Sequence, residues 1–246
     1  NIQVSNTAAT VALVGTATVG SVTIDDGAVL SLGDGTSGAD VTTTAASGTN
    51  DLLVSPDAGL GGGSLQFDAG GAAVALTMAD GAELHNDSGT VLVADDTNGV
   101  TLVEDSGAGQ MIYRGTDIDY GGQGITLGRI DYQTAMQLDT AGESVTLSDA
   151  LTADALTVAD GASFDLDDQS LTVDNGALTV NGSFDDTTGS GAAAVSVTAN
   201  DTGDVVVGST ATWTATIDLT MSGAGPTGTT LDAAVQIGSL TINPGA

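Results

Sequence analysis

Clusters of aspartate are the first feature of this sequence that could support chemistry. The stretch FDLDDQ holds Asp165, Asp167 and Asp168, and pairs of Asp occur at 25–26, 95–96 and 185–186. Calcium takes about six to eight oxygen ligands, and turns supply carboxylates and carbonyls close together. We therefore treat Asp165, Asp167 and Asp168 as a candidate Ca²⁺ site. No EF-hand loop is present, and GGQGITLGR has Thr126 where the calcium-binding nonapeptide has Asp.

A second candidate site lies in residues 111–138, whose composition differs from the rest of the chain. This segment holds both arginines and all three tyrosines, namely Tyr113, Arg114, Tyr120, Arg129 and Tyr132. One interpretation is a saccharide surface, with Tyr rings for sugars and Arg for acidic groups. The structural alternative is that Tyr stacks on Tyr and that the arginines pair with Asp117, Asp119 or Asp131 to brace the fold.

Signals for other catalytic sites are weak. His85 is the only histidine, so a Ser-His-Asp triad would have to use it, and no nucleophile elbow lies near it in sequence. We interpret His85 as a solvated turn residue. Sequence spacing does not identify which two of the 32 acidic residues would form a glycosidase pair. The chain is therefore expected not to be an enzyme.

The elements that would position these residues recur as a phrase. Its copies are SVTIDDGAVLSL, LTMADGAELHN, LTVADGASFDL, LTVDNGALTV and LTINPGA, which start at residues 21, 76, 156, 171 and 240. Each alternates apolar residues with Thr, as a short strand does, and then turns through a polar pair and Gly-Ala. The glycines of successive copies are 54, 80, 15 and 69 residues apart. Coils of about 15–25 residues accommodate all four gaps.

The composition favours an all-β fold, because Gly is abundant, aromatic residues make up 3% of the chain and no stretch has a helical apolar period. We expect a β-solenoid (parallel β-helix) that forms a single elongated β domain over residues 1–246. The inward residues would include Val158, Leu166, Leu171, Val173, Leu178 and Val180. The alternative is a β-sandwich or jelly-roll subunit that donates a strand.

The phrases LTVADGASFDLDDQSLTVDNGALTVNGSF and SVTIDDGAVLSLGDG resemble the repeats of large bacterial surface proteins with parallel β-helix stems, the autotransporter passengers and filamentous adhesins. The resemblance is one of repeat style, covers about half of the chain and is weakest between Met111 and Leu138. It implies an exported structural or adhesive role and transfers no catalytic residue. The β-helix polysaccharide lyases pair acidic metal ligands with a basic residue, which implies a carbohydrate-binding or lyase-like alternative.

The net charge of −30 predicts which partners the protein avoids. Such a chain repels copies of itself and nucleic acid and gathers cations, so salt, and calcium more than sodium, should stabilise it. The sequence has no Cys and no Lys, which excludes disulfides and lysine isopeptide bonds. No apolar run is long enough for a membrane span. We expect an extracellular or cell-surface protein whose signal peptide has been removed. The sequons at Asn86, Asn181 and Asn200 are about as many as chance predicts.

The last eight residues, SLTINPGA, open the repeated phrase without its returning strand. An unfinished coil would expose apolar side chains and unpaired amides, which a second copy could cover. The expected polymer contacts are Ile2, Val4, Val11, Leu13, Leu240 and Ile242. We therefore expect a building block of a noncovalent surface filament or biofilm-matrix fibre, assembled head-to-tail. The alternatives are a stem segment of a large adhesin and a β-helix that binds cell-surface polysaccharide.

Overall fold

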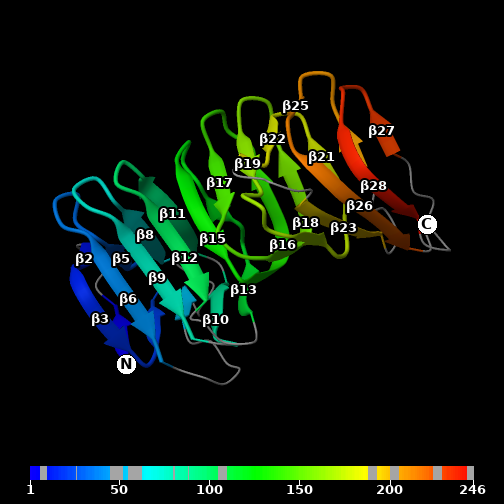
Figure 1. Cartoon of the computed structure of the whole chain (residues 1–246). Helices are drawn as coiled ribbons and strands as arrows, with labels where there is room; N and C mark the ends of the chain where they lie inside the picture. Colours follow the sequence, from blue (N-terminus) through cyan, green and yellow to red (C-terminus); the bar gives the residue numbers. More distant parts are fainter. Residues whose placement is uncertain are drawn as a thin grey trace. The chain divides into compact units, whose positions relative to one another are not determined.

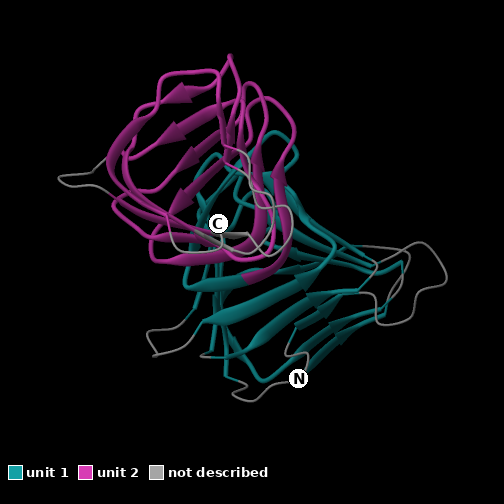
Figure 2. Cartoon of the chain, turned by 90° about the vertical axis from the view of Figure 1, so that its right-hand side faces the viewer, with its two compact units in different colours: residues 1–131 teal, residues 132–246 magenta. Residues whose placement is uncertain are grey.

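The structure is a computed structural model, and it describes residues 1–5, 10–25, 27–44, 52–54, 63–79, 81–87, 89–104, 110–187, 193–199, 205–223 and 229–242. These residues form β strands and no α-helix. The chain divides into two compact units, residues 1–131 and 132–246 (Figure 2). The sequence predicts one domain over 1–246, and the boundary between the units falls inside the atypical segment 111–138.

The first unit is a β-solenoid in which the chain visits three parallel sheets in turn. One sheet has the order β1-β4-β7-β10-β13, the second β2-β5-β8-β11-β14 and the third β3-β6-β9-β12-β15 (Figure 1). The strands are β1 (Ile2–Val4), β2 (Thr10–Leu13), β3 (Gly15–Val19), β4 (Val22–Ile24), β5 (Val29–Leu32), β6 (Ala39–Thr43), β7 (Leu52–Val54), β8 (Ser64–Asp68), β9 (Val74–Met78), β10 (Glu83–Asn86), β11 (Thr90–Asp95), β12 (Val100–Glu104), β13 (Met111–Gly115), β14 (Ile118–Asp119) and β15 (Gly124–Gly128).

The register shows how far the chain advances in one coil. Val11 pairs with Leu30, 19 residues later, and Leu30 pairs with Leu65, 35 residues later. Some coils therefore exceed the 15–25 residues that the repeat spacing predicts. The ladder constrains only the paired strands, so the segments between strands can lengthen without changing the stack.

Apolar columns fill the interior of the first unit. In the second sheet the column is Leu30, Leu65, Val91 and Ile118, and all four side chains are buried. Alternation with half-buried polar residues places one face of each strand inside. Each buried Leu, Ile or Val contributes about 1.5–3 kcal/mol, so stacking of coils stabilises what a single coil could not.

The second unit is also a parallel solenoid, but one of its faces is a bent sheet. β18 pairs through its first three residues with β20 and through its last three with β21, so a corner falls within a single strand. The strands are β16 (Ile130–Leu138), which starts at the end of the first unit, and β17 (Ser144–Leu147), β18 (Leu151–Val158), β19 (Ser163–Asp165), β20 (Leu171–Val173), β21 (Leu178–Val180), β22 (Ser183–Asp185), β23 (Ala193–Ala199), β24 (Val205–Val207), β25 (Thr212–Trp213), β26 (Thr216–Gly223), β27 (Thr229–Leu231) and β28 (Gln236–Ile242).

Aromatic residues are stacked along the other face of this unit. Phe164 pairs in register with Phe184, and Phe184 with Trp213. The ring centroids are 5.6 Å and 4.4 Å apart and the rings are near parallel, so the stack fills the interior of three successive coils.

The fold prediction is confirmed. The strand pairs of the described residues form parallel ladders, as in a solenoid, and not the antiparallel facing sheets of a sandwich. The six residues expected to point inward are all buried: Val158, Leu166, Leu171, Val173, Leu178 and Val180.

Candidate functional site: the uncovered end coils

The last strand of the second unit has one free side. β28 pairs with β26, and no described strand pairs with its other edge. Leu240 and Ile242 are 52% and 61% exposed, although residues at equivalent positions of earlier coils are buried. Backbone groups and apolar side chains on this edge are therefore available to a further strand.

An apolar cavity of about 180 Å³ opens beside β28. Its lining includes Trp213 from the aromatic stack, Met221 from β26, and Leu231, Leu240 and Ile242 from the last strands. The chain passes from β27 to β28 through residues 232–235 without forming a strand over β25. The interior of the last coil is therefore incomplete on this side.

The first coil of the first unit is uncovered in the same way. β1, β2 and β3 each pair with one strand of the next coil and with no other described strand. Val11 and Val14 are exposed, Val14 to 47%. Both end coils thus present strand edges together with apolar side chains.

Ionisable side chains are absent from the first and last segments of the chain, although Asp25 Oδ2 accepts from Gln3 Nε2 and Asp218 Oδ1 accepts from the Ser239 hydroxyl beside them. The chain carries 32 acidic residues in 246, about one in eight, yet residues 1–24 and 233–246 hold no ionisable side chain. Elsewhere, two copies of a protein with net charge −30 would repel each other strongly. Electrostatic repulsion between two copies is therefore expected to be weakest where these two surfaces meet.

The residues expected to make polymer contacts fall largely on these surfaces. Val11, Leu240 and Ile242 are exposed, and Ile2 and Leu13 are half-buried. Val4 is 3% exposed, because its side chain points into the interior in register with Ile24 of β4 in the next coil. Sequence reasoning missed two residues that line the cavity, namely Trp213 and Leu231. The runs of residues without charge were the signal that could have located both ends.

The expected saccharide surface is not formed by the tyrosines. Tyr113, Tyr120 and Tyr132 are all buried, so their ring faces pack in the interior and cannot stack on a sugar. The Tyr113 hydroxyl donates to the carbonyl oxygen of Thr116 at 2.8 Å. The rings follow the inward alternation of their strands, which explains why a rare bulky residue is a core residue here.

The two arginines form ion pairs with glutamates of the preceding coil. The Arg114 Nε lies 2.5 Å from Glu83 Oε1, and Arg129 Nη1 lies 3.5 Å from Glu104 Oε2. Both glutamates are buried, while the arginine side chains are partly exposed. These glutamates were not among the expected partners Asp117, Asp119 and Asp131, and the pairs connect adjacent coils as the bracing interpretation requires.

His85 lies in a strand and not in a turn, which corrects the sequence interpretation. It occupies β10 between Glu83 and Asp87, with imidazole nitrogens 4.0 Å and 3.8 Å from their carboxylate oxygens. Its side chain is half-buried and faces the same side of the sheet as Arg114, its partner in the ladder.

The candidate Ca²⁺ residues do not form a cluster. Asp165 accepts from the Asp167 amide and from the amide and hydroxyl of Thr187, so its carboxylate is used in the turn. Asp167 and Asp168 adopt left-handed backbone conformations, with φ of 48° and 63°. Across the described residues, no three Asp, Glu or His side chains are placed to hold a metal.

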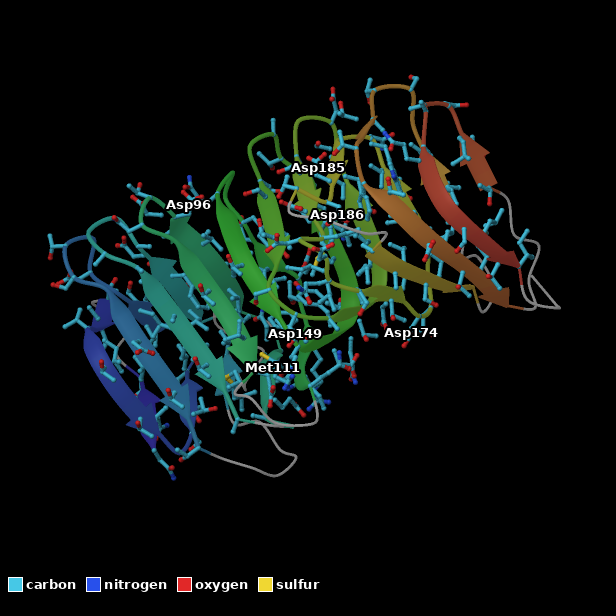
Figure 3. All side chains as sticks on the ribbon, viewed as in Figure 1. Asp96, Met111, Asp149, Asp174, Asp185 and Asp186 are labelled. Atoms are coloured by element: carbon cyan, nitrogen blue, oxygen red, sulfur yellow. The ribbon has the colours of Figure 1, made fainter. Side chains whose placement is uncertain are left out.

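The other acidic pairs also lie in or beside turns. Figure 3 labels Asp96, Asp185 and Asp186, which follow or end β11 and β22. Asp96 Oδ2 accepts from the Gly124 amide at 2.7 Å, and Asp186 Oδ1 from the Asp168 amide at 2.8 Å. These carboxylates join turns of successive coils, and Asp26 lies outside the described residues.

The sequons differ in accessibility. Asn86 is buried, with its Nδ2 donating to the carbonyl oxygen of Thr116 at 3.1 Å, so this side chain is closed to glycosylation. Asn181 is half-buried, and Asn200 lies outside the described residues.

Comparisons of the chain with protein-family models, curated proteins and solved structures find no match. In the described part of the chain, no helix is both long enough and apolar enough to cross a membrane. The function is therefore argued from the end coils themselves.

Proposed function

We propose that this protein is an extracellular structural subunit that assembles noncovalently, head-to-tail, into a surface filament or matrix fibre. The first coil of one copy covers the last coil of the next. The observation that carries the proposal is the exposed apolar cavity and strand edge at β28, in a part of the chain without charge.

The type of contact follows from its two different surfaces. A contact between the first coil and the last coil is heterologous, so it leaves one free surface at each end of every assembly and does not close by two-fold symmetry. Repetition of such a contact yields an open fibre when the rotation from one copy to the next does not close into a ring, and we propose the open form. Parallel edges also favour association, because unpaired amides and carbonyls on β28 gain partners.

The extracellular location is part of the proposal. The resemblance of the repeats to those of bacterial surface proteins supports it, as does the high acidic charge, which suits a medium rich in cations. The absence of Lys and Cys means that such a fibre would be held by packing and hydrogen bonds alone.

The test is the molecular mass of the chain as its concentration increases, measured by sedimentation velocity, together with negatively stained images. The wild type is expected to form fibres. Leu240→Asp with Ile242→Asp places two carboxylates at the apolar edge, and this variant is expected to remain monomeric. Because both side chains are exposed, the substitutions should leave the rest of the fold intact.

A matched control distinguishes the effect of charge at the β28 edge from the effect of a more negative net charge. Gln133→Glu with Gln137→Glu also adds two charges, at exposed positions of β16 away from β28. This variant is expected to form fibres like the wild type. A wild type that stays monomeric at all concentrations, or a Leu240/Ile242 variant that still forms fibres of unchanged length, would reject the proposal.

A further inference from the structure

The sequence at the two end coils contains matching triplets. In β28 the triplet LTI (residues 240–242) lies beside LTM (219–221) of β26, with apolar side chains in the interior columns and Thr outside. In β1 the triplet IQV (2–4) lies beside VTI (22–24) of β4 in the same way. At each end strand, two columns of apolar side chains therefore come to an end, together with the column of polar side chains between them.

From this match we infer that β1 of one copy pairs in parallel with β28 of another, with Ile2 beside Leu240, Gln3 beside Thr241 and Val4 beside Ile242. This inference rests on the proposed function and specifies its joint. The partner is a second copy of this chain. In this register both apolar columns and the polar column continue from one copy into the next.

Other registers are disfavoured by the alternation of the strands. A slip of one residue would place Gln3 in the apolar column and Ile2 or Val4 outside, because successive side chains point to opposite faces. A parallel orientation is required because all the neighbouring ladders are parallel, so a stacked copy repeats the relation of β28 to β26.

The neighbouring edge of β27 is a poorer match. Its triplet TTL (229–231) places Thr229 in the column of Leu178 and Val205, so pairing there would stack Ile2 on a hydroxyl-bearing residue. β27 is also shorter, with three residues against seven in β28. The longer edge offers more backbone partners to an added strand.

The cavity beside β28 supports the same joint. Its lining is apolar and its volume is about 180 Å³, larger than the cavity of about 150 Å³ that binds benzene in another protein. A first coil seated on β28 would bring its own apolar residues, including the exposed Val11 and Val14, to this end of the molecule. Residues 1–24 and 233–246 add no acidic side chain to the contact, and the carboxylates of Asp25 and Asp218 beside it accept hydrogen bonds from Gln3 and Ser239.

The test uses engineered cysteines, because the chain has none of its own. Gln3→Cys and Thr241→Cys replace exposed, outward residues that the inferred register places side by side. Neighbouring strands are about 4.8 Å apart, which lies within the Cα separation of a disulfide. With diamide as the oxidant, the double variant is expected to give a ladder of covalent multimers on a non-reducing gel, lost on reduction.

Three controls define the register and the joint. Gln3→Cys with Ser239→Cys uses the same face of β28 two residues away, where the Cα separation would be about 8 Å and the multimer ladder should be lost. Gln3→Cys with Thr230→Cys probes pairing with β27 and should also give no ladder. A mixture of the two single variants, Gln3→Cys and Thr241→Cys, should give covalent dimers and nothing larger.

The outcomes separate the joint from the proposed function. If the wild type forms fibres but the Gln3→Cys, Thr241→Cys variant gives no cross-link, the register is overturned and head-to-tail assembly stands. Equal cross-linking at positions 239 and 241 would overturn the register in the same way. Cross-linking through Thr230→Cys alone would move the joint to β27. A wild type that never assembles would reject the proposed function itself.

Discussion

Acidic side chains are sorted by length in this protein. All three glutamates, Glu83, Glu104 and Glu143, are buried, and no described aspartate is. Aspartate is short and accepts hydrogen bonds from nearby amides in turns, as Asp34 does from the amides of Thr36 and Ser37. Glutamate can reach from a strand to the next coil, where two of the three meet the arginines.

The pair of Glu83 and Arg114 should stabilise the first unit. Glu83→Gln removes the charge and leaves the guanidinium without its carboxylate at 2.5 Å. Because Arg114 is partly exposed, the expected loss is about 1 kcal/mol in the free energy of unfolding, between the surface and buried cases. Urea denaturation measures it. Asp40→Asn, at an exposed position, is the control, and an equal effect of both variants would contradict a specific pair.

Asp34 should lose part of its pKa shift in Thr36→Val. The hydroxyl of Thr36 is the main cause that lowers the pKa of Asp34 below its ordinary 3.8, with the Thr36 and Ser37 amides adding to it. Since the pKa is lowered in the folded state, the stabilisation is present above the ordinary value and is lost as pH falls through the lowered one. NMR titration should show a higher Asp34 pKa in the variant, and an unchanged pKa would contradict the assignment.

At the scale of the element, short strands depend on turns with special backbone conformations. Gly33 follows β5 with φ of +85°, and a Cβ there would lie 2.1 Å from the Asp68 carbonyl oxygen of the next coil. Gly81 precedes β10 with φ of +69°, and a Cβ there would contact nothing within 4 Å. The first turn is packed against another coil, and the second faces open space.

These two glycines allow a matched prediction. Gly81→Ala should cost about 1–2 kcal/mol in the free energy of unfolding, the cost of a left-handed backbone for an L residue. Gly33→Ala carries the same cost and also displaces the backbone of the next coil, so it should destabilise by several kcal/mol or prevent folding. Thermal unfolding of both variants measures the difference. Equal losses of stability in the two variants would show that contact with the next coil at Gly33 adds no cost.

At the scale of the whole molecule, the net charge of −30 opposes both folding and assembly. Added NaCl shortens the Debye length from about 30 Å at 0.01 M to about 3 Å at 1 M. The Tm and the extent of assembly should therefore both rise with salt. Scanning calorimetry and sedimentation measure them, and a Tm that falls or stays constant as salt rises would contradict the role of self-repulsion.

Calcium provides a second comparison at this scale. The sequence predicts a stronger effect of Ca²⁺ than of Na⁺ at matched ionic strength, whereas Asp165, Asp167 and Asp168 are not gathered into one site. Identical melting curves in calcium and in chelator would leave general screening as the only cation effect. A higher Tm in calcium would indicate a site beyond these three residues.

The sequence by itself determined the fold class and the inward residues. The alternation in LTVDNGALTV is a local property, since each Leu and Val points opposite to its neighbouring Thr in any strand. Leu171, Val173, Leu178 and Val180 could therefore be assigned to the interior before any pairing was known.

Only the tertiary structure decided which coils lie next to each other. The advance between paired residues varies from 19 residues at Val11 to 35 at Leu30, so no period in the sequence could place Arg114 beside Glu83. The variable spacing also prevented prediction of the cavity at Trp213. Such a cavity forms where a coil lacks one of its strands, and the sequence does not show which strand is absent. Alternation is set within a strand, whereas contacts between coils depend on segment lengths that the repeated phrase does not encode.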